Sequence, residues 1–556
     1  MKNRLKRVLA VLVAICLLTL SSCATIRTYV DDYQSLDGSI IPDKGFRITA
    51  NLEYEFEEQI TEQIEERFEK MEELLEANNV VRALPFLLLF EKQVQDMFYV
   101  SDHATLCNIR YYANPQDEAA MNEYIRLSEL YTDYSSRLLA MYRPIYESNY
   151  KYVFFGALSK AETQRILALA DSFTGEVATL SKDRNDLIAE YRQLSMDSTE
   201  FNEKSAELYR QIVKKNNEIA VLSGYESYPE YAYDVVYSRD YTPEDARQMH
   251  TYVKEYIVPL ANELNRELKD YAKNDPWGAK KLEEESNAIF NRVLDPITSN
   301  GEFGEYYSLQ YYDADAFIDT WENHSVFGNA DSYPVAFTTY LRYYDFPICY
   351  FGEGYQMRST YIHEQGHFAS FLDTVGGYSS MDLNEVHSQG NEWLYYSYLS
   401  DNCVDSGMYE LIVKSLALEH CLNIIVSTAC DMFEQRVYEN ADLSASEYDG
   451  VFNECVSKLG AAVLLEDYMT MNPSDYWHIA IVANSMYYLS YAVSLIPSIE
   501  LYVIAEEEGL EEAAERYIAL TEGDSEIEFQ KALKKADLCS PFDEEVYTKL
   551  KAFFVK

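Results

Sequence analysis

Basic residues are scarce in this sequence: 46 lysines and arginines stand against 93 aspartates and glutamates in 556 residues. The formal net charge of −47 excludes nucleic acid as a partner, because the two polyanions would repel each other. The same charge repels anionic lipid headgroups, so no basic surface is available to hold the protein at a membrane. The length far exceeds one small core and predicts either two lobes or one large helical body.

Glycine and proline are also sparse, at 20 and 14 residues, and we find no low-complexity stretch and no internal repeat. These absences indicate a folded globular protein. Nine cysteines are present, but no two of them have a CxxC spacing. Setting Cys16 and Cys23 aside leaves an odd number scattered along the chain, so we expect neither a disulfide framework nor a zinc site built from cysteines.

Four of the first seven residues are basic, and they are followed by an apolar run over residues 8–20 that is too short to span a bilayer comfortably. The next residues, Leu20-Ser21-Ser22-Cys23, resemble the lipobox of bacterial lipoproteins, which implies cleavage before Cys23 and a diacylglycerol anchor on it. We therefore expect a lipoprotein signal peptide over residues 1–22, a tether over residues 23–45, and an extracytoplasmic protein anchored to the bacterial cell membrane. The alternative is an apolar start with an unmodified cysteine.

Helical periodicity dominates the front half of the chain after the tether. Apolar residues recur there at steps of three and four among many acids, which is typical of amphipathic helices. The predicted helices cover residues 56–75, 122–142, 160–180 and 181–222. Thr242 predicts the start of a further helix, with Pro243 in its first turn and Asp245 at the third position, and Pro259 predicts a kink further along.

Strand signals are few. The clearest are Val335–Tyr343 and Phe346–Phe351, which are rich in aromatic and β-branched residues. Helical periodicity resumes after residue 391 and continues almost to the end of the chain. The sequence therefore predicts a mostly α protein with one small sheet.

The main motif follows the second strand: residues 363–367 read His-Glu-Gln-Gly-His. On a helix this spacing brings His363 and His367 onto one face, one turn apart, which suits a zinc ion. Glu364 lies between them and is placed to take a proton from a water molecule that the metal activates. The alternative is a surface helix with solvated histidines, because this short motif also arises by chance.

A catalytic zinc ion needs a third protein ligand and an open position. The helix expected over residues 382–396 offers Glu385 and Glu392, which lie two turns apart on one face, so spacing does not choose between them. Asp382 and His387 are weaker alternatives, since a helix-end acid and a surface imidazole are common.

Residues 385–393 resemble the glutamate-bearing helix of the thimet oligopeptidase and oligoendopeptidase F family of zinc metallopeptidases. By position, the resemblance makes Glu385 the zinc ligand and leaves Glu392 as a nearby acid that orients a histidine ring. Weaker likeness extends over residues 224–540. The family implies a large, helical, bowl-like fold with a small β-sheet beside a deep active-site cleft, a catalytic region over residues 224–556 and an N-terminal helical region over residues 46–223.

A tyrosine block at residues 486–492 resembles the family's C-terminal helix, whose phenols face the zinc. The resemblance makes Tyr488 and Tyr491 candidate donors to the oxyanion of the tetrahedral intermediate, whereas composition alone favours packing, because the chain has 50 tyrosines. His478 is a candidate substrate contact, although it lies further from Tyr491 than in the family. His387 stands where the family has proline or alanine, and we hypothesise that it binds product or a second metal ion.

Together these features predict a lipid-anchored zinc endopeptidase that binds one zinc ion and hydrolyses short peptides. The family resemblance further implies that the strand Val335–Tyr343 forms the cleft edge along which an extended peptide pairs. One alternative is a peptide-binding lipoprotein with the same fold and no turnover. Another is a zinc exopeptidase, since Leu383-Asn384-Glu385 also looks like a segment of zinc aminopeptidases.

Overall fold

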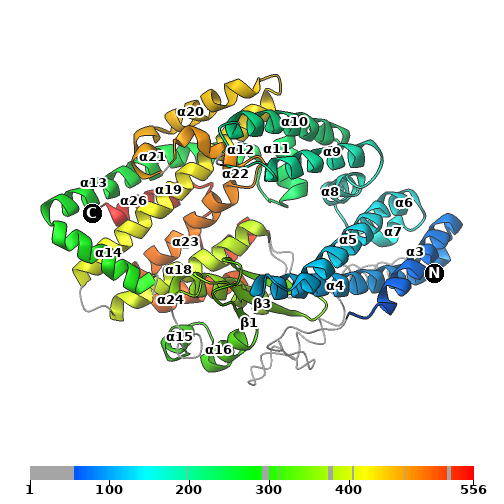
Figure 1. The fold of residues 1–556 in the computed structure, drawn as a ribbon, viewed down its shortest axis with the longest axis horizontal. Coiled ribbons are helices and arrows are strands. Elements are labelled where there is room, and N and C mark those ends of the chain that lie inside the picture. Colours follow the sequence, from blue (N-terminus) through cyan, green and yellow to red (C-terminus); the bar gives the residue numbers. More distant parts are fainter. Residues whose placement is uncertain are drawn as a thin grey trace, which may run out of the picture. The chain divides into compact units, whose positions relative to one another are not determined.

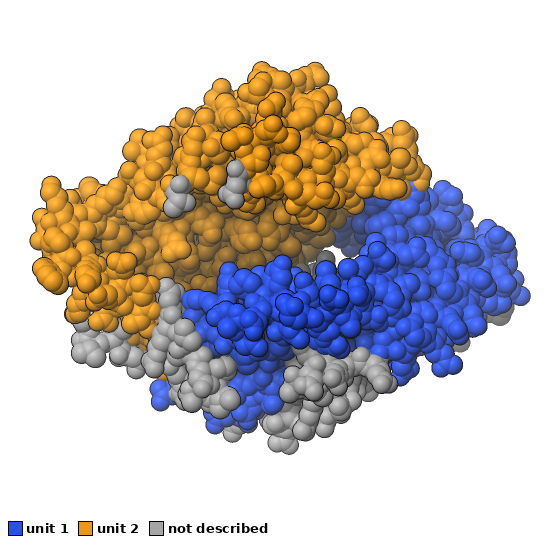
Figure 2. All heavy atoms as spheres, in the orientation of Figure 1, with its two compact units in different colours: residues 1–174, 293–378, 523–526 blue, residues 175–292, 379–522, 527–556 orange. Residues whose placement is uncertain are grey.

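The computed structural model describes residues 56–555 except 197, 291–299, 312, 374–379, 403–405, 470 and 522–527. The predicted signal peptide, Cys23 and the tether lie outside the described residues. The chain forms two compact units (Figure 2). Unit 1 comprises residues 1–174, 293–378 and 523–526, and unit 2 comprises residues 175–292, 379–522 and 527–556.

Unit 1 begins with an antiparallel set of helices whose apolar faces form one core. In α3, the buried residues recur at steps of three and four, as the sequence predicted, and the opposite face carries the glutamates. The helices of this unit are, in chain order, α3 (Gln59–Ala77), α4 (Ala83–Ala113), α5 (Glu118–Ala140), α6 (Tyr142–Glu147), α7 (Lys151–Phe154), α8 (Lys160–Asp171), α15 (Asn300–Tyr307), α16 (Ala314–Asn323) and α17 (Arg358–Asp373).

A three-stranded sheet with the order β1-β3-β2 completes unit 1. Figure 1 labels its strands β1 and β3. Strand β3 (Phe346–Phe351) has the predicted bounds and is fully buried. It pairs antiparallel with β2 (Ala336–Leu341), which is shorter than predicted. Strand β1 (Ser325–Phe327) pairs parallel with β3 and was not predicted. Helix α4 packs on one face of the sheet through a shared apolar cluster, and α17 contacts β2 and β3.

Unit 2 is helical throughout its described residues. The predicted helix over residues 181–222 is interrupted at residues 193–200, and Thr242 caps α12 through the expected reciprocal bonds with Asp245. Pro259 lies in the first turn of α13, directly after a π-helical turn at Val253–Ile257. The longer helices are α9 (Gly175–Arg192), α10 (Phe201–Leu222), α12 (Pro243–Tyr252), α13 (Val258–Asn274), α14 (Pro276–Phe290), α18 (Met381–Asn402), α19 (Ser406–Glu439), α20 (Tyr448–Leu459), α23 (Leu489–Glu507), α24 (Leu510–Thr521) and α26 (Glu544–Phe554).

Helix α23 forms the centre of unit 2. It is apolar and long enough to cross a membrane, as is the segment Gly407–Glu439, but 89% of the apolar stretch of α23 is buried inside the protein. Helices α18, α19 and α24 pack against it. We therefore interpret α23 as a core helix. The predicted boundary at residue 224 falls inside unit 2, between α10 and the short helix α11 (Tyr228–Tyr231).

Candidate metal centre

Helix α17 carries both histidines of the main motif. Its apolar residues Tyr361, Ile362 and Phe368 are fully buried and fix the helix against unit 1, while His363 and His367 remain half-buried. The two imidazoles lie one turn apart, with ring centroids separated by 5.0 Å and ring planes at 84°. The predicted spacing therefore places two nitrogen ligands on one side of the helix.

Glu364 lies between the histidines and is 5% exposed. Its carboxylate Oε2 accepts a hydrogen bond of 2.7 Å from the hydroxyl of Thr338 on β2. The thiol of Cys349 on β3 lies 3.2 Å from the same hydroxyl, and burial raises the pKa of this thiol, so it stays protonated. The sheet thus holds the Glu364 carboxylate in one orientation through Thr338.

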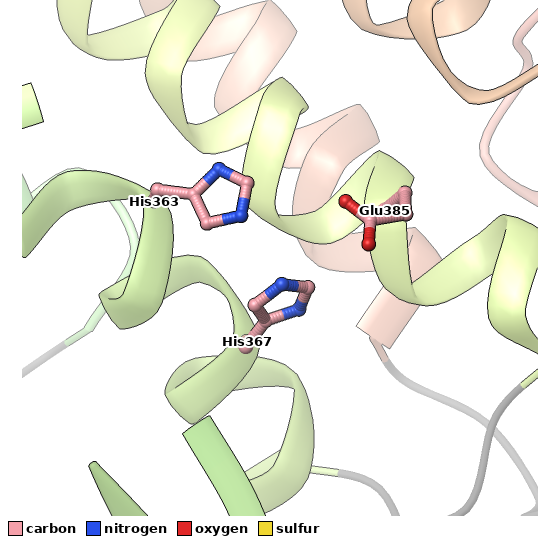
Figure 3. A group of neighbouring side chains, drawn as sticks. All are labelled: His363, His367 and Glu385. Carbon is pink, nitrogen blue, oxygen red and sulfur yellow. The ribbon is translucent and has the colours of Figure 1, made fainter. Parts of the chain in front are cut away.

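Glu385 lies on α18, in the first turns of the helix. One donor atom each of His363, His367 and Glu385 lies within 4.8 Å of the other two, and Figure 3 shows these side chains turned toward a common point. Two imidazoles and one carboxylate are a donor set that catalytic zinc sites use. The three residues therefore fit the zinc ion that the motif predicted.

The other candidate ligands on α18 do not belong to this group. Glu392 accepts a hydrogen bond of 3.1 Å from the Tyr396 hydroxyl, one turn along the same helix. Asp382 is buried and accepts a hydrogen bond of 2.9 Å from Tyr241 in unit 2. The group of three potential ligands therefore contains Glu385 and neither of these two acids.

His387 follows Glu385 by two residues and so projects from nearly the opposite side of α18. Its ring is completely buried against Tyr517 of α24, and neither nitrogen has a hydrogen-bond partner among the described residues. Burial lowers the pKa of His387 to about 3, so the ring is neutral. The hypothesis that His387 binds product or a second metal ion beside the site is not supported, because its ring lies in the core of unit 2.

The tyrosine block differs from its predicted form. Met486 adopts a left-handed backbone conformation with φ of 63°, and α23 begins only at Leu489, so Tyr488 is the residue before the helix. The ring of Tyr488 packs edge-on against Tyr476. The Tyr487 and Tyr491 hydroxyls lie 3.2 Å apart instead.

The negative charge of Glu385 influences the pKa values of Tyr487 and Tyr491. Burial raises the pKa of both, and the negative charge of Glu385 raises it further, so both stay protonated and able to donate. Sequence analysis selected Tyr491 but missed Tyr487. The four-residue spacing of the two tyrosines, one helical turn, is the signal that would have suggested the pair.

A buried arginine holds the turn that presents these phenols. Arg239 donates hydrogen bonds to Ser490 Oγ (3.0 Å) and to the carbonyl of Tyr487 (3.4 Å), and its Nε lies 3.8 Å from the Asp382 carboxylate at the start of α18. The backbone N–H of Met486 donates to the buried carboxyl of Glu434 at 2.7 Å. One guanidinium therefore connects the tyrosine turn with the helix that carries Glu385.

Replacing Arg239 by methionine is expected to lower the free energy of unfolding by about 3 kcal/mol, because Asp382 would remain buried without its charged partner. Urea denaturation measures this loss. Arg247→Met is the matched control, since Arg247 is half exposed and its ion pair with Glu244 contributes less than about 1 kcal/mol. Equal losses in the two variants would contradict the role assigned to Arg239.

His478 lies in unit 2 on the short helix α22 (Tyr476–Ala480) and is almost completely buried. Its Nδ1 bonds to Ser205 Oγ at 2.7 Å, its Nε2 lies 3.0 Å from the Asp449 carboxylate, and its ring stacks on Trp477. Both nitrogens are therefore occupied by the protein itself. The predicted substrate contact through His478 has no support in this arrangement, because the ring offers no free polar atom.

The mostly helical fold with one small sheet is shared with solved peptidase structures. One is Pz peptidase A with an inhibitor, at 17% identity and a TM-score of 0.68, covering 90% of this chain and 98% of that chain. A second is oligoendopeptidase F from Enterococcus faecium, at 13% identity and a TM-score of 0.55, covering 89% of this chain and 96% of that chain. A third is metallocarboxypeptidase 1 from Trypanosoma cruzi, at 14% identity and a TM-score of 0.51, covering 82% of this chain and 95% of that chain. No protein-family model and no curated protein sequence matches the chain. At these identities the likeness establishes a common fold.

Proposed function

We propose that this protein is a zinc-dependent endopeptidase that hydrolyses short peptides. The observation that carries the proposal is the grouping of His363, His367 and Glu385 beside a buried, oriented Glu364. Random surface histidines would lack both the carboxylate donor and the supporting hydroxyl of Thr338. The fold shared with Pz peptidase A and oligoendopeptidase F supports the same assignment.

His363, His367 and Glu385 would hold one zinc ion, which would supply Lewis-acid chemistry toward a water molecule and the substrate carbonyl. Glu364 takes the proton of the attacking water and later delivers it to the leaving amine. The Thr338 hydroxyl keeps the carboxylate pointed in one direction during both transfers. Tyr487 and Tyr491 remain protonated and donate hydrogen bonds to the carbonyl oxygen as negative charge develops on it.

Tyr491→Phe is expected to lower kcat by about 10²-fold with little change in KM, because a hydrogen bond to the developing oxyanion acts mainly in the transition state. Steady-state kinetics on one fluorogenic peptide measures both constants. We expect a smaller loss of kcat for Tyr487→Phe, which removes the hydroxyl paired with Tyr491. Tyr488→Phe distinguishes the two assignments: the family resemblance predicts a comparable loss, whereas its packing against Tyr476 predicts a normal kcat.

The location that we propose for the enzyme rests on its N-terminal sequence. We propose that Cys23 carries a lipid anchor and that the enzyme acts on peptides outside the cytoplasm, as the lipobox-like segment implies. The strongly acidic composition agrees with attachment through a lipid and not through a basic surface.

Digestion of a peptide library with added zinc, followed by mass spectrometry of the products, tests the proposal. We expect internal cuts in short peptides and little degradation of a folded protein. Removal of terminal residues alone would make the enzyme an exopeptidase, an activity found under the same fold in a protein named a metallocarboxypeptidase. Binding of peptides without any cleavage would instead make this a peptide-binding lipoprotein.

A further inference from the structure

Unit 1 contains a cavity of about 330 Å³ that none of the residues discussed so far explains. One face of α4 forms one wall, one face of α5 forms another, and β2 closes the third side; α4 and α5 run alongside each other in Figure 1. Hydroxyl groups from all three elements line the cavity, together with the amide of Asn108 and the rings of Tyr124, Tyr131 and Phe337. The lining contains no charged side chain.

The cavity and the candidate base lie on opposite faces of the same strand. Side chains alternate along a strand, and in β2 the Thr338 hydroxyl reaches Glu364 on α17, whereas its neighbours Phe337 and Thr339 line the cavity. The cavity is therefore one residue away, along β2, from the group that orients Glu364.

The register of the sheet shows which backbone groups of β2 point away from β3. Pro347, which lacks an N–H, stands opposite Tyr340, and Gly352 donates to the carbonyl of Val335 at 2.8 Å. Both facts place the β2–β3 hydrogen bonds at the odd-numbered residues of β2, so the N–H and C=O groups of Ala336 and Thr338 point toward the outer edge. Strand β2 is one of the two edge strands of the sheet among the described strands.

We propose that this cavity is a side-chain subsite for a peptide that pairs with the outer edge of β2. The inference rests on the proposed peptidase function and adds a preference to it. An extended peptide at this edge places alternate side chains on the two faces of the sheet. When one residue lies on the Glu364 face, the next lies over the cavity.

The chemistry of the lining defines the side chain that this subsite accepts. The hydroxyls of Thr105 and Thr132 donate to carbonyls of their own helices and accept hydrogen bonds from a ligand, whereas the other hydroxyls and the Asn108 amide can also donate. The three rings provide apolar walls, so serine, threonine, asparagine, glutamine and tyrosine side chains fit. Charged side chains are disfavoured, because the cavity offers no opposite charge to offset the loss of water. The subsite therefore selects uncharged polar or aromatic side chains at one position of the substrate.

The test introduces one charge without changing the volume of the cavity. Asn108→Asp is expected to raise kcat/KM at least about fivefold for peptides with lysine or arginine at one fixed distance from the cut, relative to peptides with glutamine there. Cut-site mapping in a peptide library measures this ratio at every position. Asn122→Asp on the exposed side of α5 is the matched control and should leave the pattern unchanged.

A second variant keeps the proposal testable if Asn108→Asp folds poorly. Ser128→Phe reduces the cavity, so we expect a loss of cleavage for tyrosine and glutamine at the same position and normal cleavage for glycine and alanine. Unchanged preferences in both variants, with cleavage intact, would overturn the subsite and leave the peptidase assignment standing. No cleavage by the wild-type protein would overturn the peptidase assignment and the subsite with it.

Discussion

Glu364→Gln is expected to lower kcat by about 10³-fold while leaving the bound zinc in place. Glutamine has nearly the same shape and still accepts the hydrogen bond from Thr338, but its amide cannot take a proton from water. The loss therefore reports proton transfer and not a rearranged helix. Steady-state kinetics and elemental analysis of the same protein sample measure the two quantities.

The control for this substitution is Glu353→Gln, which changes an exposed glutamate of the same unit. We expect a normal kcat and normal zinc content for this variant. A Glu364→Gln protein that retains wild-type kcat would show that another group accepts the proton. Loss of zinc in Glu364→Gln would show that the glutamate acts as a ligand, contrary to our assignment.

Glu385→Ala is expected to lose zinc during dialysis and to lose more than about 100-fold in activity. Removing a group that only hydrogen-bonds a metal ligand typically costs up to about 100-fold, so a larger loss indicates a ligand. The physical reason is that two histidines alone leave the metal short of a protein ligand. Metal content after dialysis and kcat/KM measured with and without added zinc provide the two readouts.

Glu392→Ala is the matched control, since it removes a carboxylate from the same helix two turns away. Its carboxylate bonds to Tyr396 and is absent from the ligand group, so we expect this variant to keep its zinc. Zinc loss in Glu392→Ala with zinc retained in Glu385→Ala would reverse the ligand assignment.

Local spacing predicted those parts of the site that depend on neighbours within a few residues. The four-residue step brings His363 and His367 together on α17 whatever the rest of the fold does. The capping residues at Thr242 and the strand β3 were predicted for the same reason. Strand β1 has only three residues, too few for an alternating pattern to be visible.

Spacing left the choice between Glu385 and Glu392 open, because both acids share one face of α18. The family resemblance chose Glu385, and the structure places only Glu385 with the histidines. That outcome depends on the tertiary structure. A pattern within one helix carries no information about it.

The residues whose predicted roles differ from their contacts in the structure are those whose side-chain orientation depends on packing in the core. Met486 has a left-handed backbone conformation just before α23, and the Tyr491 hydroxyl lies beside the Tyr487 hydroxyl, whereas Tyr488 contacts Tyr491 through its ring. Both ring nitrogens of His478 form hydrogen bonds with residues in other segments of the chain, Ser205 and Asp449. Arg239 belongs to no recognisable sequence motif, because its partners Asp382 and Ser490 lie in distant segments of the chain.

The central claim is that His363, His367 and Glu385 bind one zinc ion. Diffraction from crystals of the zinc-loaded protein, recorded at the zinc absorption edge, tests it most directly. We predict one anomalous peak bonded to two imidazole nitrogens and one carboxylate oxygen at about 2.0–2.2 Å. A peak only at the other group of potential ligands, Asp449, Asp475 and His478, or no peak at all, would contradict the assignment.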